Sequence, residues 1–194
     1  MGEINKLTEP IAGKPVVRHV AETILAAGFT DIVVVLGHDS GAVERCLDGL
    51  PVRFVMNDDY QSGQASSVGV GVAALNSRAT DVMIVLGDMP LLQPSFLQDL
   101  QRHHLANSQH EKMIGLPVHI QDGQRQVGHP VVWGRQFFSE LQRLKGDQGG
   151  RQIWAEHPAM ISHLTVDDPT SFMDTDTPDA LKKVEALLLA RGDR

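Results

Sequence analysis

The sequence has one cysteine in 194 residues, few aromatic residues, and no long apolar or basic run. Because Cys46 stands alone, an internal disulfide is excluded. No apolar run approaches the roughly 20 residues that a membrane-spanning helix needs. The formal net charge of −7 and the absence of lysine or arginine clusters argue against a nucleic-acid backbone as the main partner. No signal-peptide pattern precedes the first expected helix, so we expect a cytoplasmic protein with no nucleic-acid or membrane partner.

The histidines are numerous but scattered. The chain contains nine of them, of which only His103 and His104 are adjacent. Neighbouring residues of a helix point in different directions, so this pair is a poor start for a metal site. No spacing in the chain matches the known zinc ligand sets, and the sequence therefore does not predict a structural zinc site.

Expected helices and strands alternate along the first half of the chain, which is typical of an α/β protein with parallel strands and right-handed crossovers. A length of 194 residues suits one domain with a sizeable core, and we expect a single domain over 1–194. From apolar spacing and from helix caps and stops, helices are expected at 14–27, 40–47, 64–75, 95–106, 137–144, near 153–154 and from 177 onward. Strands are expected at 31–36, 52–56, 82–88, 112–117, 130–133 and 161–166, with a polar loop at 121–128.

The most informative stretch is V-M-I-V-L-G-D-M-P-L-L at residues 82–92. Its apolar run is typical of a strand buried on both faces, and Gly87 and Asp88 follow it directly. Ligands of open α/β sheets bind at the carboxyl ends of strands, so Asp88 is expected in the active-site crevice. A carboxylate there suits Mg²⁺ that carries substrate phosphates. The alternative is a turn aspartate that caps the helix beginning near Pro94.

A second acidic segment, F-M-D-T-D-T-P-D at residues 172–179, contains another candidate ligand. Asp176 and Asp179 are explained by the favourable position of acids at a helix start. Asp174 comes too early for that role, so it and Asp88 could hold one Mg²⁺ from opposite sides. The alternative is a group of solvated acids at a helix start.

Other polar candidates are weaker on their own. Ser66 and Ser67 open a helix, where hydroxyl and backbone N–H groups could bind a base edge or a phosphate, or could simply cap the helix. The glycine-rich segment around them lacks the Lys-Ser/Thr pair of a phosphate-binding loop. His129 precedes Pro130 at a strand entrance and could contact a phosphate or a pterin-like ring, although a surface histidine is the default. Lys6 is a cation near the amino end, a position at which lysine is ordinarily only solvated.

Short motifs recur in order along nearly the whole chain. They are M-G-x-x-N-K-L at 1–7, G-K-P-V-V-R-H-V at 13–20, V-V-V-L-G-H at 33–38, N-D-D-Y-Q-S-G at 57–63, S-S-V-x-x-G at 66–71, L-G-D-M-P-L-L at 86–92, G-H-P-V-V-W-G-R at 128–135, G-D-Q-G-G-R at 146–151 and D-T-D-T-P at 174–178. Each motif is modest, but their order and spacing are specific. Together they resemble the molybdenum cofactor cytidylyltransferases of the MobA-like nucleotidyltransferase family.

The resemblance implies a fold and a reaction. The fold would be a three-layer α/β/α sandwich with a Rossmann-like, mostly parallel sheet, as in nucleotide-diphospho-sugar transferases. A terminal phosphate oxygen of molybdopterin would attack the α-phosphate of CTP and release pyrophosphate, with Mg²⁺ or Mn²⁺ as the cofactor. The product would serve a molybdoenzyme of the xanthine dehydrogenase kind.

The resemblance also implies roles for individual residues. Lys6 and Asp88 would be catalytic, and Asp88 and Asp174 would hold the metal. The nucleotide-binding residues would be Lys6, Ser66, Ser67 and Gly87, while His129 and Pro130 would face the pterin.

One departure from the family pattern lies at the start of the chain. Members carry a strand and a glycine-rich loop, L-A-A-G-x-S-x-R, directly before the M-G with which this sequence opens. We therefore expect a domain truncated at its N-terminus, with weak nucleotide binding and little catalysis. The alternatives are a nucleotidyltransferase that uses GTP or a sugar phosphate, and a non-catalytic protein that holds molybdenum cofactor for delivery.

Overall fold

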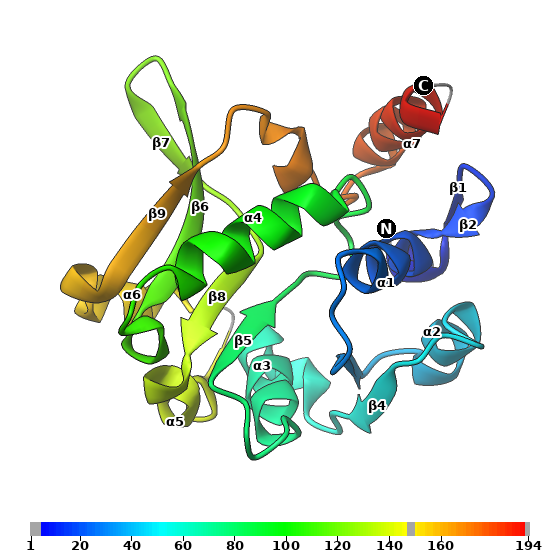
Figure 1. Ribbon diagram of the computed structural model, residues 1–194. Helices are drawn as coiled ribbons and strands as arrows, with labels where there is room; N and C mark the ends of the chain where they lie inside the picture. The colour runs from blue at the N-terminus through cyan, green and yellow to red at the C-terminus, as the bar shows by residue number, and fades with distance from the viewer. Residues whose placement is uncertain (1–4, 147–149, 193–194) are drawn as a thin grey trace.

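The computed structural model describes residues 5–146 and 150–192 as a mixed α/β fold (Figure 1). The helices are α1 (Val16–Ala26), α2 (Ser40–Cys46), α3 (Gln64–Ala73), α4 (Pro94–Leu105), α5 (Phe138–Leu141), α6 (Arg151–Glu156) and α7 (Pro178–Gly192). The strands are β1 (Pro10–Ile11), β2 (Lys14–Pro15), β3 (Val33–Leu36), β4 (Arg53–Met56), β5 (Asp81–Ile84), β6 (Ile114–Gln121), β7 (Gln124–Val127), β8 (Val131–Gly134) and β9 (Ile161–Thr165). The short 3₁₀ helices include η1 (Lys6–Thr8) and η3 (His110–Lys112).

The described strands form a mixed arrangement rather than a mostly parallel sheet. The largest sheet has the order β5-β8-β6-β7, with β9 also beside β6, while β3 pairs with β4 and β1 with β2. Only β3–β4 and β6–β9 are parallel among these pairs. The three-layer sandwich stays a prediction, because the described strands fall into separate hydrogen-bonded sheets.

One antiparallel pair of the largest sheet is a hairpin that the sequence did not predict. The polar stretch expected as a loop at 121–128 contains β7, which pairs with β6 through a two-residue turn at Asp122 and Gly123. Both turn residues have positive φ, 52° and 76°, as tight hairpin turns require. All of β7 is exposed, so its sequence lacks the alternation that marks a half-buried strand.

Apolar side chains cover both faces of the largest sheet. On one face, Ile114 and Trp133 pack with residues of α3, α5 and α6. On the other, Met83 of β5 lies in a cluster with Val20 of α1 and Leu97 of α4. In Figure 1, α4 crosses the sheet, while α7 lies beside α1 at the edge of the fold. No helix within the described ranges combines the length and apolar composition needed to cross a bilayer.

The segment after β5 leads to the candidate site. The strand ends at Ile84, four residues before Asp88, rather than at Asp88 itself. Val85 and Leu86 leave the strand and pack against the α1–α4 cluster, and Gly87 and Asp88 form a turn. Asp88 therefore still follows the carboxyl end of β5, as the apolar run predicted.

Candidate functional site

Lys6, in η1, joins two acids from distant parts of the chain. Its Nζ lies 2.6 Å from Oδ2 of Asp88, and it also forms an ion pair with Oδ1 of Asp176. Asp176 lies just before α7, so the amino end, the middle and the carboxyl end of the chain meet at one ammonium group.

Burial and charge act against each other at Lys6. Burial alone would lower its pKa, because the charged ammonium loses water. The hydrogen bonds to Asp176 and Asp88 and the negative charges of the two acids outweigh that effect, so the pKa of Lys6 is raised above its ordinary value. Lys6 therefore carries its positive charge at neutral pH.

The two carboxylate oxygens of Asp88 have different surroundings. Its side chain is 16% exposed, and Oδ2 is paired with Lys6. Oδ1 is buried and has no hydrogen-bond partner among the described residues. A buried carboxylate oxygen without a partner is costly, so this atom is suited to a ligand such as a hard divalent cation. Thr175, fully buried, donates its hydroxyl to the backbone carbonyl of Asp88 at 3.4 Å and holds the two segments together.

The structure places Asp176, rather than Asp174, at the Lys6–Asp88 pair. Asp174 is exposed, and its Oδ1 accepts a hydrogen bond from the backbone N–H of Asp176 at 3.3 Å. The sequence predicts either Thr177 or Asp176 as the cap of the last helix, and the structure shows Thr177 in that role, since its hydroxyl accepts from the N–H of Ala180 at 3.1 Å. Asp176 was not selected as a site residue because its place at a helix start already explained its charge. The metal role of Asp174 stays a prediction.

Ser66 and Ser67 are held by a residue that sequence reasoning did not select. Asn57, buried at the end of β4, donates from Nδ2 to Oγ of Ser66 at 2.8 Å and to Oγ of Ser67 at 3.0 Å. Ser66 also donates to the carbonyl of Gly63 at 2.8 Å, as expected at the first turn of α3. Asn57 could have been selected from the sequence because it directly follows an apolar strand. Gly87 lies against Leu7, in the turn that leads to Asp88.

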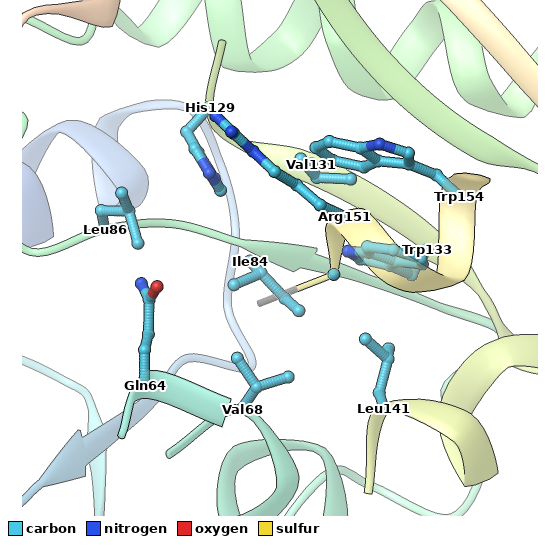
Figure 2. A pocket seen from close by; sticks show the side chains of 11 residues that line it. Gln64, Val68, Ile84, Leu86, His129, Val131, Trp133, Leu141, Arg151 and Trp154 are labelled. Atoms are coloured by element: carbon cyan, nitrogen blue, oxygen red, sulfur yellow. The ribbon is translucent and has the colours of Figure 1, made fainter. Parts of the chain in front are cut away.

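A pocket of about 490 Å³ lies next to these residues (Figure 2). Figure 2 shows His129, Arg151 and Trp154 on one side and Gln64 and Val68 on the other. The full lining is Gln64, Val68, Ile84, Leu86, His129, Val131, Trp133, Leu141, Gly150, Arg151 and Trp154. Apolar and aromatic walls with a few polar groups are typical of a site for a small organic ligand.

Two indole rings form part of the pocket wall. The rings of Trp133 and Trp154 are nearly parallel, with 10° between their planes and 6.4 Å between their centroids. Gly150 lies against Trp133, and a Cβ atom at this position would lie 2.3 Å from Cζ2 of the indole. The wall therefore depends on a residue without a side chain.

His129 faces the pocket in a largely buried position. Burial lowers its pKa, the positive charge of Arg151 lowers it further, and the charge of Asp88 offsets part of the shift. Its Nδ1 is buried without a hydrogen-bond partner among the described residues, so a ligand in the pocket could supply one. Pro130, which follows through a cis peptide bond, is buried and begins the approach to β8.

Parts of two sequence motifs lie outside the described residues, namely 1–4 of the first motif and 147–149 of the G-D-Q-G-G-R motif. The remaining predicted site residues fall into three groups. Lys6, Gly87 and Asp88 come together, Ser66 and Ser67 lie at the start of α3, and His129 lines the pocket.

The sequence is similar to curated proteins that carry different names. Nicotine blue oxidoreductase of Paenarthrobacter nicotinovorans is 26% identical over 187 residues, which cover 95% of this chain and 89% of that protein. Bifunctional protein GlmU of Syntrophomonas wolfei is 33% identical over 107 residues, which cover 53% of this chain. The chain spans less than a quarter of that relative's length, since only 22% of it is matched.

Solved structures share the fold. Rv0371c from Mycobacterium tuberculosis H37Rv, in complex with manganese, matches with a TM-score of 0.72 and 27% identity, covering 93% of this chain and 91% of that one. CMP:2-keto-3-deoxy-manno-octonic acid synthetase complexed with CTP matches with a TM-score of 0.76 over 96% of this chain and 92% of that one. Its identity is 16%, so this likeness concerns the fold alone.

Residues 1–161 match the family described as the MobA-like NTP transferase domain. This match covers most of the chain, and the Lys6–Asp88 pair and the pocket lie in a fold shared with nucleotidyltransferases. The chain belongs to the MobA-like NTP transferase domain family.

Proposed function

We propose that this nucleotidyltransferase moves a cytidylyl group from CTP to the terminal phosphate of molybdopterin and releases pyrophosphate. The observation that carries the proposal is the grouping of Lys6, Asp88 and Asp176 together with a pocket with aromatic walls, whose lining residue His129 lies close enough to Asp88 for its charge to act on it. One cation and two acids suit the charge of a triphosphate and its metal ion, and the pocket suits a flat acceptor.

The transfer needs positioning and charge neutralisation rather than a protein nucleophile. A phosphate oxygen of the acceptor forms a bond to the α-phosphorus of CTP. The bond from that phosphorus to the bridging oxygen of the β-phosphate breaks, and its electron pair leaves with pyrophosphate. The role of the protein is to hold the attacking oxygen and the leaving group in line.

Asp88 would hold Mg²⁺ or Mn²⁺ through the oxygen that has no partner, and the second acid would be Asp176 or Asp174. Such an ion neutralises triphosphate charge and polarises the α-phosphate when bound. Lys6 would turn from the acids to the phosphate oxygens and stabilise the charge that develops on the leaving group. The proximity of Asp176 to Lys6 favours it over Asp174.

Ser66 and Ser67 would contact the cytosine or the ribose from the first turn of α3. Asn57 fixes both hydroxyl oxygens, so these donors would meet the nucleotide in one orientation. Gly87 would let the nucleotide approach the backbone of the turn before Asp88.

The acceptor would lie in the pocket of Figure 2. Trp154, which stacks on the buried ring of Trp133, offers a flat apolar surface for a pterin ring, and Arg151 offers a positive charge for its phosphate. His129 would contact the acceptor through its unpartnered ring nitrogen. We further propose a cytoplasmic location and a recipient molybdoenzyme of the xanthine dehydrogenase kind, both from the sequence resemblance alone.

Two alternatives keep the same fold. One is a nucleotidyltransferase that uses GTP or a sugar phosphate, and the pocket of about 490 Å³ has room for either acceptor. The other is an oxidoreductase, which is favoured by the match to nicotine blue oxidoreductase over 89% of that protein's length. A third reading is a binding protein that delivers the cofactor without catalysis.

The test measures pyrophosphate release by the purified chain with Mg²⁺, molybdopterin and each of CTP, GTP and ATP. We expect release that requires both CTP and molybdopterin, and a cytidylylated pterin detected by mass spectrometry. Matched reactions replace molybdopterin with a sugar phosphate, or omit the nucleotide and supply a pyridine nucleotide with an aromatic dye. Tight molybdopterin binding without pyrophosphate would favour the delivery protein, and turnover of the dye would favour the oxidoreductase.

A further inference from the structure

A second cluster of metal-ligating side chains lies at the opposite end of β5 from Asp88. Asp81 is the first residue of β5, His104 lies in the last turn of α4, and His110 begins η3. These residues play no part in the site described above, and no sequence spacing indicated that they would meet.

The donor atoms of the cluster converge. Nε2 of His104 lies 2.8 Å from Oδ1 of Asp81, and Nδ1 of His110 lies 2.9 Å from Oδ2 of the same carboxylate. One ligand atom from each residue falls within 4.8 Å of the other two. A tetrahedral zinc ion with bonds of about 2.1 Å needs neighbouring ligand atoms roughly 3.3 Å apart. To hold an ion, the two hydrogen-bonded pairs, at 2.8 and 2.9 Å, would open by about half an ångström, and each imidazole would turn a nitrogen lone pair toward the metal.

Packing fixes the three side chains in place. The side chain of His104 is fully buried, while those of Asp81 and His110 are 14% and 25% exposed. Gly115 leaves room for His104, since a Cβ atom there would lie 3.1 Å from its Nδ1. Gly134 lets the His110 segment approach, because a Cβ atom at Gly134 would lie 2.4 Å from the backbone of Glu111.

The chemistry of the donor set selects the class of ion. Two imidazoles and one carboxylate suit zinc and its transition-metal neighbours, whereas Mg²⁺ prefers oxygen ligands alone. We propose that Asp81, His104 and His110 form a second metal site, for a divalent cation of the zinc class, with one coordination position open to solvent through the His110 side. The ion would join the start of β5 to the end of α4 and to η3.

The first test titrates the metal-free full chain with Zn²⁺ and follows binding by calorimetry. The variants are His110→Gln and Asp81→Asn, which remove one ligand each. The matched controls are His157→Gln, from a half-buried cluster with Glu140 and Glu156, and Asp88→Asn, from the proposed nucleotide site. Circular dichroism checks that every variant is folded.

We expect a tight Zn²⁺ site in the unaltered chain that both controls retain. Loss of a supporting residue around a metal already weakens binding 10- to 100-fold, so loss of a ligand should weaken it at least about 100-fold in His110→Gln and Asp81→Asn. Saturating Zn²⁺ should raise the Tm of the unaltered chain and leave that of His110→Gln unchanged.

Several outcomes would overturn the proposal. They are undiminished Zn²⁺ binding in His110→Gln, loss of the tight site in either control, and no Zn²⁺ binding to the unaltered chain in the micromolar range. If the ligand variants do not fold, the visible absorption spectrum of Co²⁺ bound to the unaltered chain tests the proposal instead. Intense visible absorption supports nitrogen ligation at low coordination number, and the weak spectrum of a hydrated six-coordinate ion overturns it.

Discussion

Lys6 and Asp88, 82 residues apart in the chain, form an ion pair with 2.6 Å between Nζ and Oδ2. Asp88 has no lysine or arginine near it in the sequence, so the partner of its charge becomes evident only from the fold. Asp176, 170 residues from Lys6, completes the group. Substitutions of these three residues, one at a time, therefore test the proposed site directly.

Replacing Lys6 with Met should lower kcat/KM for pyrophosphate release by about 10²- to 10³-fold, the usual cost of removing one donor to a developing negative charge. The control is Lys14→Met, which removes another lysine in an ion pair, with Glu22, on the surface of the fold. A Lys6→Met enzyme as active as the Lys14→Met enzyme would exclude Lys6 from the chemistry.

The second acid of the metal site can be assigned with Mn²⁺ binding followed by electron paramagnetic resonance in the presence of nucleotide. We expect Asp88→Asn to abolish binding, Asp176→Asn to weaken it strongly and Asp174→Asn to leave it nearly unchanged. The reason is that Asp176 already meets Asp88 through Lys6, whereas the carboxylate of Asp174 accepts a hydrogen bond from the backbone N–H of Asp176. The reverse order for the last two variants would restore Asp174 as the ligand.

Asn57→Ala should reduce the free energy of unfolding by roughly 1–3 kcal/mol, because two serine hydroxyls lose their common buried donor. Urea denaturation measures this change. Asn76→Ala provides the comparison, since Asn76 is exposed and caps only the N–H of Arg78. Equal effects of the two substitutions would show that the Asn57 network does not stabilise the start of α3.

His129 should contribute to the pH dependence of stability. Its folded pKa lies below the ordinary value of about 6.5, so the unfolded chain binds more protons in the window between the two values. Stability should therefore fall as the pH falls from about 6.5 toward the folded pKa, with a slope from this residue of at most about 1.4 kcal/mol per pH unit.

Urea unfolding at several pH values tests the effect, with His129→Gln beside the unaltered chain. The variant should lose less stability on acidification, and NMR titration should place the pKa of His129 below 6.5. An unchanged slope together with an ordinary pKa would contradict the buried position of this ring.

Local patterns predicted most helices and strands because their apolar spacing reflects burial. Val17, Val20 and Ala21 line the buried face of α1, and Gly28, with φ of 92°, follows its end as expected for a helix stop. The hairpin strand β7 was missed because it is exposed on both faces and carries no apolar alternation.

Contacts between distant segments were beyond the reach of the same reasoning. Asp88 was predicted as a site residue from the strand before it, but the role of Asp176 was hidden by its place before a helix. Asp81 and His104 are 23 residues apart and meet only because the end of α4 packs beside the start of β5. Residue spacing cannot reveal such a pairing, since it depends on the tertiary packing of three elements.

Gly150 sets the depth of the pocket without reaching into it. Its Cα touches the indole of Trp133 so closely that even a methyl group would have to push the ring or the start of α6 aside. Because Gly150 itself lines the pocket, any side chain at this position would change the shape of the wall. A single substitution at Gly150 would thus reshape the cavity while the ten other residues that line it stay the same.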